Sequence, residues 1–245
     1  MSTDLWKGLR AEARQQLETR DYSKAPVEER VSTSGVNASE LIAADGGGSD
    51  KPDWWIPGVE VFSRRVFQQK QRGHFAEFAR ETDGKLAEIG MWPKQWATAL
   101  MNAESAKGFH IHPPFIADDQ DPEAWFQKLF VEEPENYSLR PYANEQWDAM
   151  FFPQGICEMF LVDERAGMPR RKMRFVIEGD DKPGDNNAGV VIPAGVAHSL
   201  QSLSTKDLIM VYGTSTTFLP ENEGRIESGI EGTTMPPDWE RYFLG

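Results

Sequence analysis

Lys107-Gly-Phe-His-Ile-His-Pro113 and Val191-Ile-Pro-Ala-Gly-Val-Ala-His198 hold three of the four histidines of this 245-residue chain. Successive side chains of a strand point to opposite faces, so His110 and His112 would project from the same face. The Pro-Ala-Gly step in the second stretch is typical of a turn, and the strand after it would carry His198. We expect the three imidazoles to converge on one cavity inside a barrel, where they would mark a functional site.

Short apolar segments separated by Gly, Pro and Asp make up most of the chain from residue 54 onward. Runs of Val, Ile, Phe and Trp bounded by turn residues are typical of strands, and many such strands indicate a barrel or a sandwich. The expected strands cover residues 59–66, 96–101, 106–112, 149–152, 156–162, 172–177, 189–192, 198–202 and 207–214. Apolar residues at helical spacing predict one helix within this domain, across 75–89.

Two further regions depart from the strand pattern. Residues 1–53 are expected to form an N-terminal extension, with a short charged helix from Thr3 to about Arg20 and a flexible linker rich in Ser, Gly and Asp across 32–53. Residues 54–245 would form the main domain, which contains an acidic and aromatic insertion at about 117–146. Because loops of this length are commonly functional or solvated, we interpret the insertion as a surface loop or a lid.

The chain is acidic, with a formal net charge of -13. Such a charge argues against a nucleic-acid partner. Local charge can still hold a diphosphate. One basic cluster comprises Arg64, Arg65, Lys70 and Arg72. The single Cys157 lies in an apolar run and is expected to be a buried, unreactive thiol. No run has the length of a membrane span or the apolar core of a signal peptide, so we expect a soluble, cytoplasmic protein with no membrane partner.

Six segments occur in the order in which dTDP-4-dehydrorhamnose 3,5-epimerases contain similar segments. They are residues 56–67 and 72–75, Gln95, residues 107–110 and 160–163, and residues 192–198. From about Trp54 to Ile226 the chain resembles this family and is identified as a divergent member of it. The resemblance implies a cupin, which is an all-β double-stranded β-helix (jelly-roll) barrel, and it implies a homodimer without a cofactor.

The same resemblance implies proton transfer on a nucleotide-linked 4-keto-6-deoxy sugar. A ketone acidifies the neighbouring C–H bonds, so a base can remove one proton while a cation steadies the enolate and another group returns a proton to the opposite face. His110 matches the general base of the family. Asp163 and His198 match the buried pair that lines its substrate pocket. We therefore expect His110, Asp163 and His198 to be the catalytic residues.

The resemblance also implies three substrate-binding residues. Arg72 matches a contact to the nucleotide diphosphate, which the family supplies across the dimer from swapped N-terminal strands. Gln95 matches a nucleotide contact. Lys107 stands where the family has an arginine, so it keeps the charge but lacks the bidentate fork that suits phosphate.

At several positions the chain departs from the family pattern. Asp148 aligns with the enolate-stabilising lysine, a part that Lys128 in the insertion could take instead. The second-face tyrosine would fall at Thr217–Phe218, where neither side chain is a phenolic acid, and Tyr212 upstream is expected to be a core residue. Asp238 is a loose counterpart of the aspartate that orients the base. These departures leave the second proton donor unidentified.

Three functions remain open. We rank first an epimerase- or isomerase-like enzyme that uses His110 as its base, with no metal. The second is a metal-dependent cupin, in which His110, His112 and His198 hold Zn, Fe or Mn. Because two prolines follow His112 directly, its strand offers no glutamate ligand, and Asp118 or Glu158 would have to supply the carboxylate. The third is a non-catalytic sugar-binding module.

Overall fold

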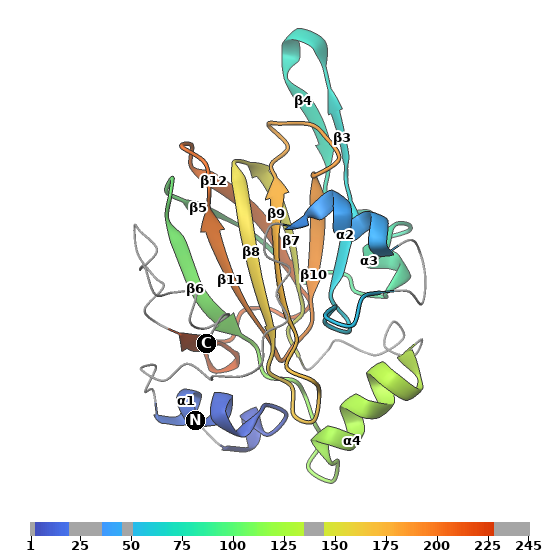
Figure 1. Ribbon diagram of the computed structural model, residues 1–245, viewed down its shortest axis with the longest axis vertical. Helices are drawn as coiled ribbons and strands as arrows, with labels where there is room; N and C mark the ends of the chain where they lie inside the picture. Colours follow the sequence, from blue (N-terminus) through green and yellow to red (C-terminus); the bar gives the residue numbers. More distant parts are fainter. Residues whose placement is uncertain (1–2, 20–35, 46–50, 135–144, 228–245) are drawn as a thin grey trace.

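Two large β-sheets make up the body of the molecule (Figure 1). The computed structural model describes residues 3–19, 36–45, 51–134 and 145–227. The six-stranded sheet consists, in order, of β1 (Val36–Asn37), β9 (Lys172–Glu178), β8 (Ile156–Asp163), β11 (Val196–Ser202), β6 (Ala106–Ile111) and β13 (Gly224–Glu227). The five-stranded sheet consists, in order, of β2 (Glu60–Ser63), β10 (Ala188–Ile192), β7 (Asp148–Gln154), β12 (Leu208–Thr214) and β5 (Gln95–Met101). Neighbouring strands are antiparallel except for β1 and β9, and this arrangement confirms the predicted all-β jelly-roll.

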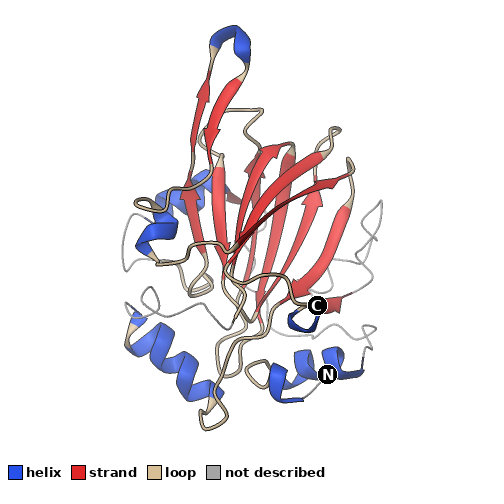
Figure 2. Ribbon diagram, turned by 180° about the vertical axis from the view of Figure 1, so that it is seen from behind, coloured by secondary structure: helices blue, strands red, loops and turns tan. Residues whose placement is uncertain are grey.

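A two-stranded hairpin projects beyond the barrel (Figures 1 and 2). It is formed by β3 (Arg65–Gln68) and β4 (His74–Glu77), with the short helix η2 (Lys70–Arg72) at its turn. The predicted strand 59–66 is therefore two strands that belong to different sheets. Phe67 and Phe75 face each other across the hairpin and are 56% and 49% exposed.

The remaining helices are short and lie around the sheets (Figure 2). They are η1 (Thr3–Trp6), α1 (Ala11–Thr19), α2 (Ala38–Asp45), α3 (Lys85–Glu88), α4 (Pro122–Gln127), the π-helical η3 (Lys128–Glu132) and η5 (Pro220–Asn222). The predicted helix across 75–89 is wrong, because β4 takes its first residues and Gly84, with a φ of 83°, separates them from α3. No helix in the described ranges is both long and apolar enough to cross a membrane.

The alternation of side chains along each strand builds the core. On β8, Cys157, Met159 and Leu161 lie in the core between the sheets, whereas Phe160 and Val162 belong to a cluster on the outer face. This period of two is the expected pattern for a strand that is covered on both faces. Cys157 is a buried free thiol, as predicted, and burial raises its pKa.

The N-terminal region packs on the barrel at two places. Four side chains are buried against the outer face of the six-stranded sheet: Trp6 of η1, Leu9 of the segment between the helices, and Ala13 and Leu17 of α1. Burial of a leucine-sized side chain contributes about 1.5–3 kcal/mol to the free energy of unfolding. The structure corrects the linker prediction for residues 36–45, because β1 pairs with β9 and α2 places Ala38 and Leu41 in the main core. The division at residue 53 stays a prediction.

The described part of the 117–146 insertion forms α4 and η3. Asp121 caps α4 by accepting a hydrogen bond from Ala124 N at 2.8 Å. Phe126 is buried with Ile116 and Met168, and it anchors the insertion to the body. Residues 135–144 lie outside the described ranges, so the choice between a lid and a surface loop stays open.

Candidate functional site

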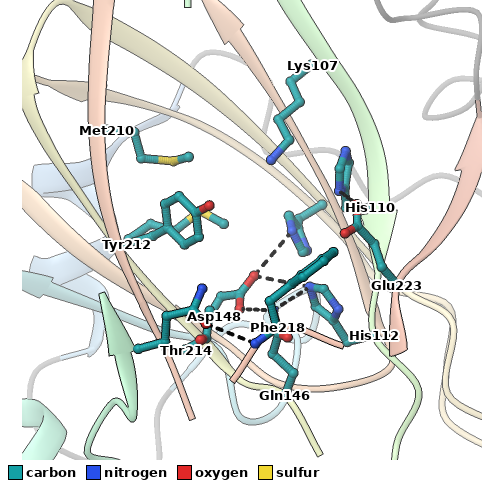
Figure 3. A pocket seen from close by; sticks show the side chains of 13 residues that line it. Lys107, His110, His112, Gln146, Asp148, Met210, Tyr212, Thr214, Phe218 and Glu223 are labelled. Atoms are coloured by element: carbon teal, nitrogen blue, oxygen red, sulfur yellow. Dashed lines mark hydrogen bonds and ion pairs between the residues drawn. The ribbon is translucent and has the colours of Figure 1, made fainter. Parts of the chain in front are cut away.

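A cavity of about 150 Å³ opens between the two sheets (Figure 3). Strands β6 and β11 form one wall, and β7 and β12 of the other sheet form the opposite wall. The lining residues are Gln95, Lys107, His110, His112, Gln146, Asp148, Met150, His198, Met210, Tyr212, Thr214, Phe218 and Glu223. The three histidines of the two opening stretches thus converge on one cavity, as the sequence predicted.

The strand register explains this convergence. His198 pairs directly with His110, and the register then shifts so that Leu200 pairs with Lys107. Such a bulge re-aims side chains, and here it allows Lys107 and His110 to face the cavity although they are three residues apart. The turn before β11 needs Gly195, whose φ is 81° and whose added Cβ would lie 2.5 Å from the Arg165 side chain.

His110 is hydrogen-bonded to the Glu223 carboxylate. Its Nδ1 lies 2.8 Å from Glu223 Oε1. Burial lowers the pKa of His110, and Lys107 and Arg225 lower it further against the opposing effect of Glu223. The hydrogen bond to His110 lowers the pKa of Glu223 to about 2. At neutral pH, His110 is therefore a neutral imidazole that donates from Nδ1, and Nε2 is its basic nitrogen.

The other two histidines share Asp148. His112 Nε2 lies 3.3 Å and His198 Nε2 lies 3.5 Å from Asp148 Oδ2. On the far side of each ring, Nδ1 meets a backbone carbonyl: His112 meets Asn222 at 3.0 Å, and His198 meets Val196 at 3.4 Å. Both rings therefore turn Nε2 toward the same carboxylate oxygen.

Gln146 orients the second oxygen of this carboxylate. Its amide nitrogen donates to Asp148 Oδ1 at 2.9 Å and lies 3.1 Å from His112 Nε2. Burial alone would raise the pKa of Asp148, but His112, His198 and Gln146 together hold it well below its usual value. Burial would likewise lower the pKa of His112, but Asp148 and neighbouring groups reverse that effect and raise it. Burial and nearby cations lower the pKa of His198 to about 3, although Asp148 opposes them, so this imidazole is neutral at neutral pH.

A cation and a phenol face each other across the cavity. Lys107 points inward from β6, and Tyr212 points inward from β12 on the opposite wall (Figure 3). Burial raises the pKa of Tyr212, and Asp148 and Glu223 add to the shift, so the phenol keeps its proton. Tyr212 is partly buried against the main core, as predicted, and it also lines the cavity.

Asp163 is not brought to the cavity. It is fully buried at the end of β8, where Arg165 Nε donates to Oδ1 at 2.8 Å and an Arg165 terminal nitrogen donates to Oδ2 at 2.7 Å. Arg165 also donates to the Pro57 carbonyl and stacks on Phe130 at 4.2 Å from the ring centroid. The geometry indicates a structural ion pair for Asp163 and offers no contact that would support the catalytic role implied by the resemblance.

The predicted nucleotide contacts lie in different places. Gln95 lines the cavity, and its side-chain oxygen accepts a hydrogen bond from Phe218 N at 2.9 Å. Arg72 is exposed at the turn of the projecting hairpin, outside the cavity lining. Arg64 does not belong to a surface cluster, because it is buried in an ion pair with Asp180 at 2.6 Å.

The groups expected to assist the base are also not the ones that the structure places beside it. Lys128 lies in η3 of the insertion, not in the cavity lining, and Asp238 lies outside the described residues. The carboxylate that meets the base is Glu223, which precedes the last described strand. A search for an acidic side chain near the end of the domain, without restriction to aspartate, would have included it.

Comparison with known proteins bears on the fold. No family model matches the chain. The chain is 24% identical over 191 residues to the spore coat polysaccharide biosynthesis protein SpsL of Bacillus subtilis strain 168, and the alignment covers 77% of this chain and 99% of that protein.

Solved structures of nucleotide-sugar enzymes superpose on the barrel. A dTDP sugar isomerase from Desulfovibrio desulfuricans G20 has a TM-score of 0.52 at 12% identity, over 75% of this chain and 92% of that chain. The dTDP-4-dehydrorhamnose 3,5-epimerase of Bacillus anthracis str. Ames has a TM-score of 0.47 at 17% identity, over 69% of this chain and 78% of that chain. The superposition on the isomerase establishes the fold: the chain has the same barrel architecture as that dTDP sugar isomerase.

Proposed function

We propose that the protein is an epimerase- or isomerase-type enzyme that abstracts a proton next to the ketone of a nucleotide-linked 4-keto-6-deoxy sugar. The observation that carries this proposal is the pair His110–Glu223 on one wall of a cavity whose opposite wall presents Tyr212. A base on one face of a sugar ring and an acid on the other are what inversion at carbon requires.

Each group has a defined part in the reaction. His110 Nε2 removes the proton α to the ketone, the C–H electron pair forms a carbon–carbon double bond, and the C=O π pair moves onto the keto oxygen to give the enolate. The Lys107 ammonium stabilises the oxygen as negative charge develops there. The Tyr212 hydroxyl then delivers a proton to the opposite face of the carbon as the ketone re-forms. The imidazolium of His110 releases its proton to solvent, and the tyrosinate takes one up from solvent.

The size of the cavity indicates how the substrate binds. At about 150 Å³ it is smaller than the clefts that hold whole drug-sized ligands, which occupy roughly 300–1,000 Å³. The sugar ring would enter the cavity, and the nucleotide would lie at its rim near Gln95 and Phe218. In a homodimer, the hairpin of a second copy would bring Arg72 to the diphosphate.

The pair His110–Glu223 favours an enzyme over a non-catalytic sugar-binding module. A binding module has no use for a neutral histidine that is oriented by an ionised carboxylate inside a buried cavity. The proton transfers described here use only side chains and substrate, so they need no organic cofactor.

Solvent exchange tests the proposal. Purified protein is incubated with dTDP-4-keto-6-deoxyglucose in deuterated water, and NMR follows deuterium at C3 and C5 of the sugar. We expect deuterium to appear at one or both carbons with the wild-type protein and not with His110→Ala. No exchange above the protein-free rate would overturn the proposal.

A further inference from the structure

Three buried side chains of metal-binding types meet at the cavity wall. His112, Asp148 and His198 each offer one ligand atom, and these atoms all lie within 4.8 Å of one another. They come from three separate places in the fold: the residue after β6, the first residue of β7, and β11. The proton-transfer scheme above assigns none of them a part.

The spacing of these atoms fits shared coordination better than direct hydrogen bonding. Ligand atoms at about 2.1 Å from a tetrahedral metal ion lie about 3.4 Å from each other. The two distances from histidine Nε2 to Asp148 Oδ2 are 3.3 and 3.5 Å. A charge-assisted hydrogen bond between such groups would be shorter, about 2.7–2.9 Å.

The surrounding contacts are those of metal ligands. A histidine that binds a metal usually donates its other ring N–H to a carbonyl or a carboxylate. His112 Nδ1 and His198 Nδ1 both face backbone carbonyls, at 3.0 and 3.4 Å. Asp148 receives the Gln146 amide on Oδ1, which leaves Oδ2 directed at the two imidazoles. These contacts orient all three ligands. The Gln146 amide also lies 3.1 Å from His112 Nε2, and it would donate to Asp148 alone once that nitrogen binds the ion.

We propose that His112, Asp148 and His198 bind one divalent first-row transition-metal ion, with open coordination positions toward the cavity. Two imidazoles and one carboxylate suit zinc, iron, manganese or cobalt in the divalent state. This set of ligands differs from the His110, His112 and His198 set that the sequence suggested for a metal-dependent cupin. His110 lies outside the group of ligand atoms that approach within 4.8 Å of one another, and Asp148 supplies the carboxylate that the strand after His112 lacks.

The ion would lie beside the proposed base. The His110 and His198 ring centroids are 6.2 Å apart, so one sugar ring can contact both His110 and the ion. A keto oxygen on the ion would be polarised by a Lewis acid, which stabilises the negative charge of an enolate. This role as electrophile rests on the proposed function, whereas the binding of the ion does not.

Metal titration tests the site without any sugar. The full-length protein is dialysed against chelator and then titrated with Co²⁺ by calorimetry and visible absorption. We expect one equivalent per chain, and we expect His112→Ala to weaken binding by more than about 100-fold, beyond the roughly 10–100-fold loss expected for an outer-shell contact. The control His110→Ala removes a neighbouring imidazole of the same cavity and should leave Co²⁺ affinity unchanged.

Two measurements guard against misfolding and adventitious binding. Asp148→Asn keeps the shape of the side chain but loses the anion, so it should bind Co²⁺ weakly while its circular dichroism spectrum stays that of the wild type. X-ray absorption of the zinc-loaded protein should show two imidazoles at about 2.0–2.1 Å. Less than a tenth of an equivalent of bound metal, or equal losses in His110→Ala and His112→Ala, would overturn the proposal. Neither result affects the deuterium-exchange test, because that test is run both with and without chelator.

Discussion

Glu223 Oε1 lies 2.8 Å from His110 Nδ1 because β13 pairs with β6 at the edge of the six-stranded sheet. The register that places Arg225 opposite His110 brings the residue just before β13 to the base. A strand far away in sequence thereby sets the tautomer of His110 and the direction of its basic nitrogen.

Glu223→Gln should weaken the base without removing it. The amide can still accept the Nδ1 proton, but it loses the negative charge that raises the pKa of His110 against burial. We expect kcat/KM for the keto sugar to fall by about 10–100-fold, within the range that general-base catalysis contributes. The acidic limb of the kcat/KM–pH profile should move to lower pH.

The matched control is Glu221→Gln, which changes an exposed glutamate two residues away. It should leave both the rate and the pH profile unchanged. An unshifted acidic limb in Glu223→Gln would show that His110 does not titrate under the influence of Glu223.

Tyr212→Phe should separate proton removal from inversion. The variant keeps His110, so deuterium from solvent should still enter the carbon next to the ketone. Without the phenol on the opposite wall, we expect the rate of inversion to fall by about 100-fold or more. NMR of the recovered sugar measures both quantities in one experiment.

Val211→Ala is the control for this variant, because Val211 lies next to Tyr212 on β12 and the cavity lining does not include it. Its exchange and inversion rates should match those of the wild type. Equal losses of exchange and inversion in Tyr212→Phe would argue that Tyr212 does not act as the separate second-face acid.

Asp163→Asn should affect folding more than chemistry. The substitution leaves the buried Arg165 guanidinium without its counter-charge, and breaking such a pair costs about 3–5 kcal/mol. Urea denaturation should show this loss of unfolding free energy, while the exposed control Asp185→Asn shows almost none. A stable Asp163→Asn protein that lacks activity would instead restore the catalytic role expected from the resemblance.

The sequence was most informative where the pattern is local. The alternation of apolar residues located the segments that became β8, β9 and β12, because a period of two depends only on neighbours. The same reasoning placed His110 and His112 on one face. It missed β13, which is recognisable as a strand only through its pairing with β6.

The errors in the site have physical causes as well. Asp163 forms an ion pair with Arg165, two residues later in the chain. An alignment of motifs does not reveal this local contact. Tyr212 shares the inward face of β12 with Met210 and Thr214, and the alternation along a strand does not distinguish a core position from a cavity wall. Asp148 and Gln146 meet His112 only because β7 begins opposite the end of β6, which is a tertiary relationship.

His198 should make the folded protein less stable in acid. Its pKa is lowered in the folded state from an ordinary value of 6.5, so the unfolded chain binds more protons as the pH falls below 6.5. The unfolding free energy should therefore decrease with falling pH, by at most about 1.4 kcal/mol per pH unit from this residue. Above pH 6.5 the contribution is constant.

Urea denaturation in chelator at several pH values between 5 and 7.5 measures this slope. His198→Gln should flatten it, whereas His74→Gln, which changes an exposed histidine on the hairpin, should not. The same slope in wild type and His198→Gln would mean that other groups cause the acid sensitivity.

Arg72 should act on the cavity of a second copy. It lies at the turn of the projecting hairpin, and its own chain does not bring it to the cavity lining. Arg72→Ala and His110→Ala are purified separately, and each should have low activity as a homodimer. After unfolding and refolding together, half of the dimers are mixed, and one of the two sites in each mixed dimer has both residues intact. We expect recovery of about a quarter of wild-type activity.

The same mixture distinguishes the two possible sources of Arg72. If Arg72 served the cavity of its own chain, every site in a mixed dimer would lack one residue, and no activity would return. Arg65→Ala is the matched control: it removes a hairpin arginine from the start of β3, away from the turn, and we expect it to keep most of the activity alone. Light scattering on each sample checks the dimer itself, because a monomeric protein could show neither complementation nor a contribution of Arg72 across an interface.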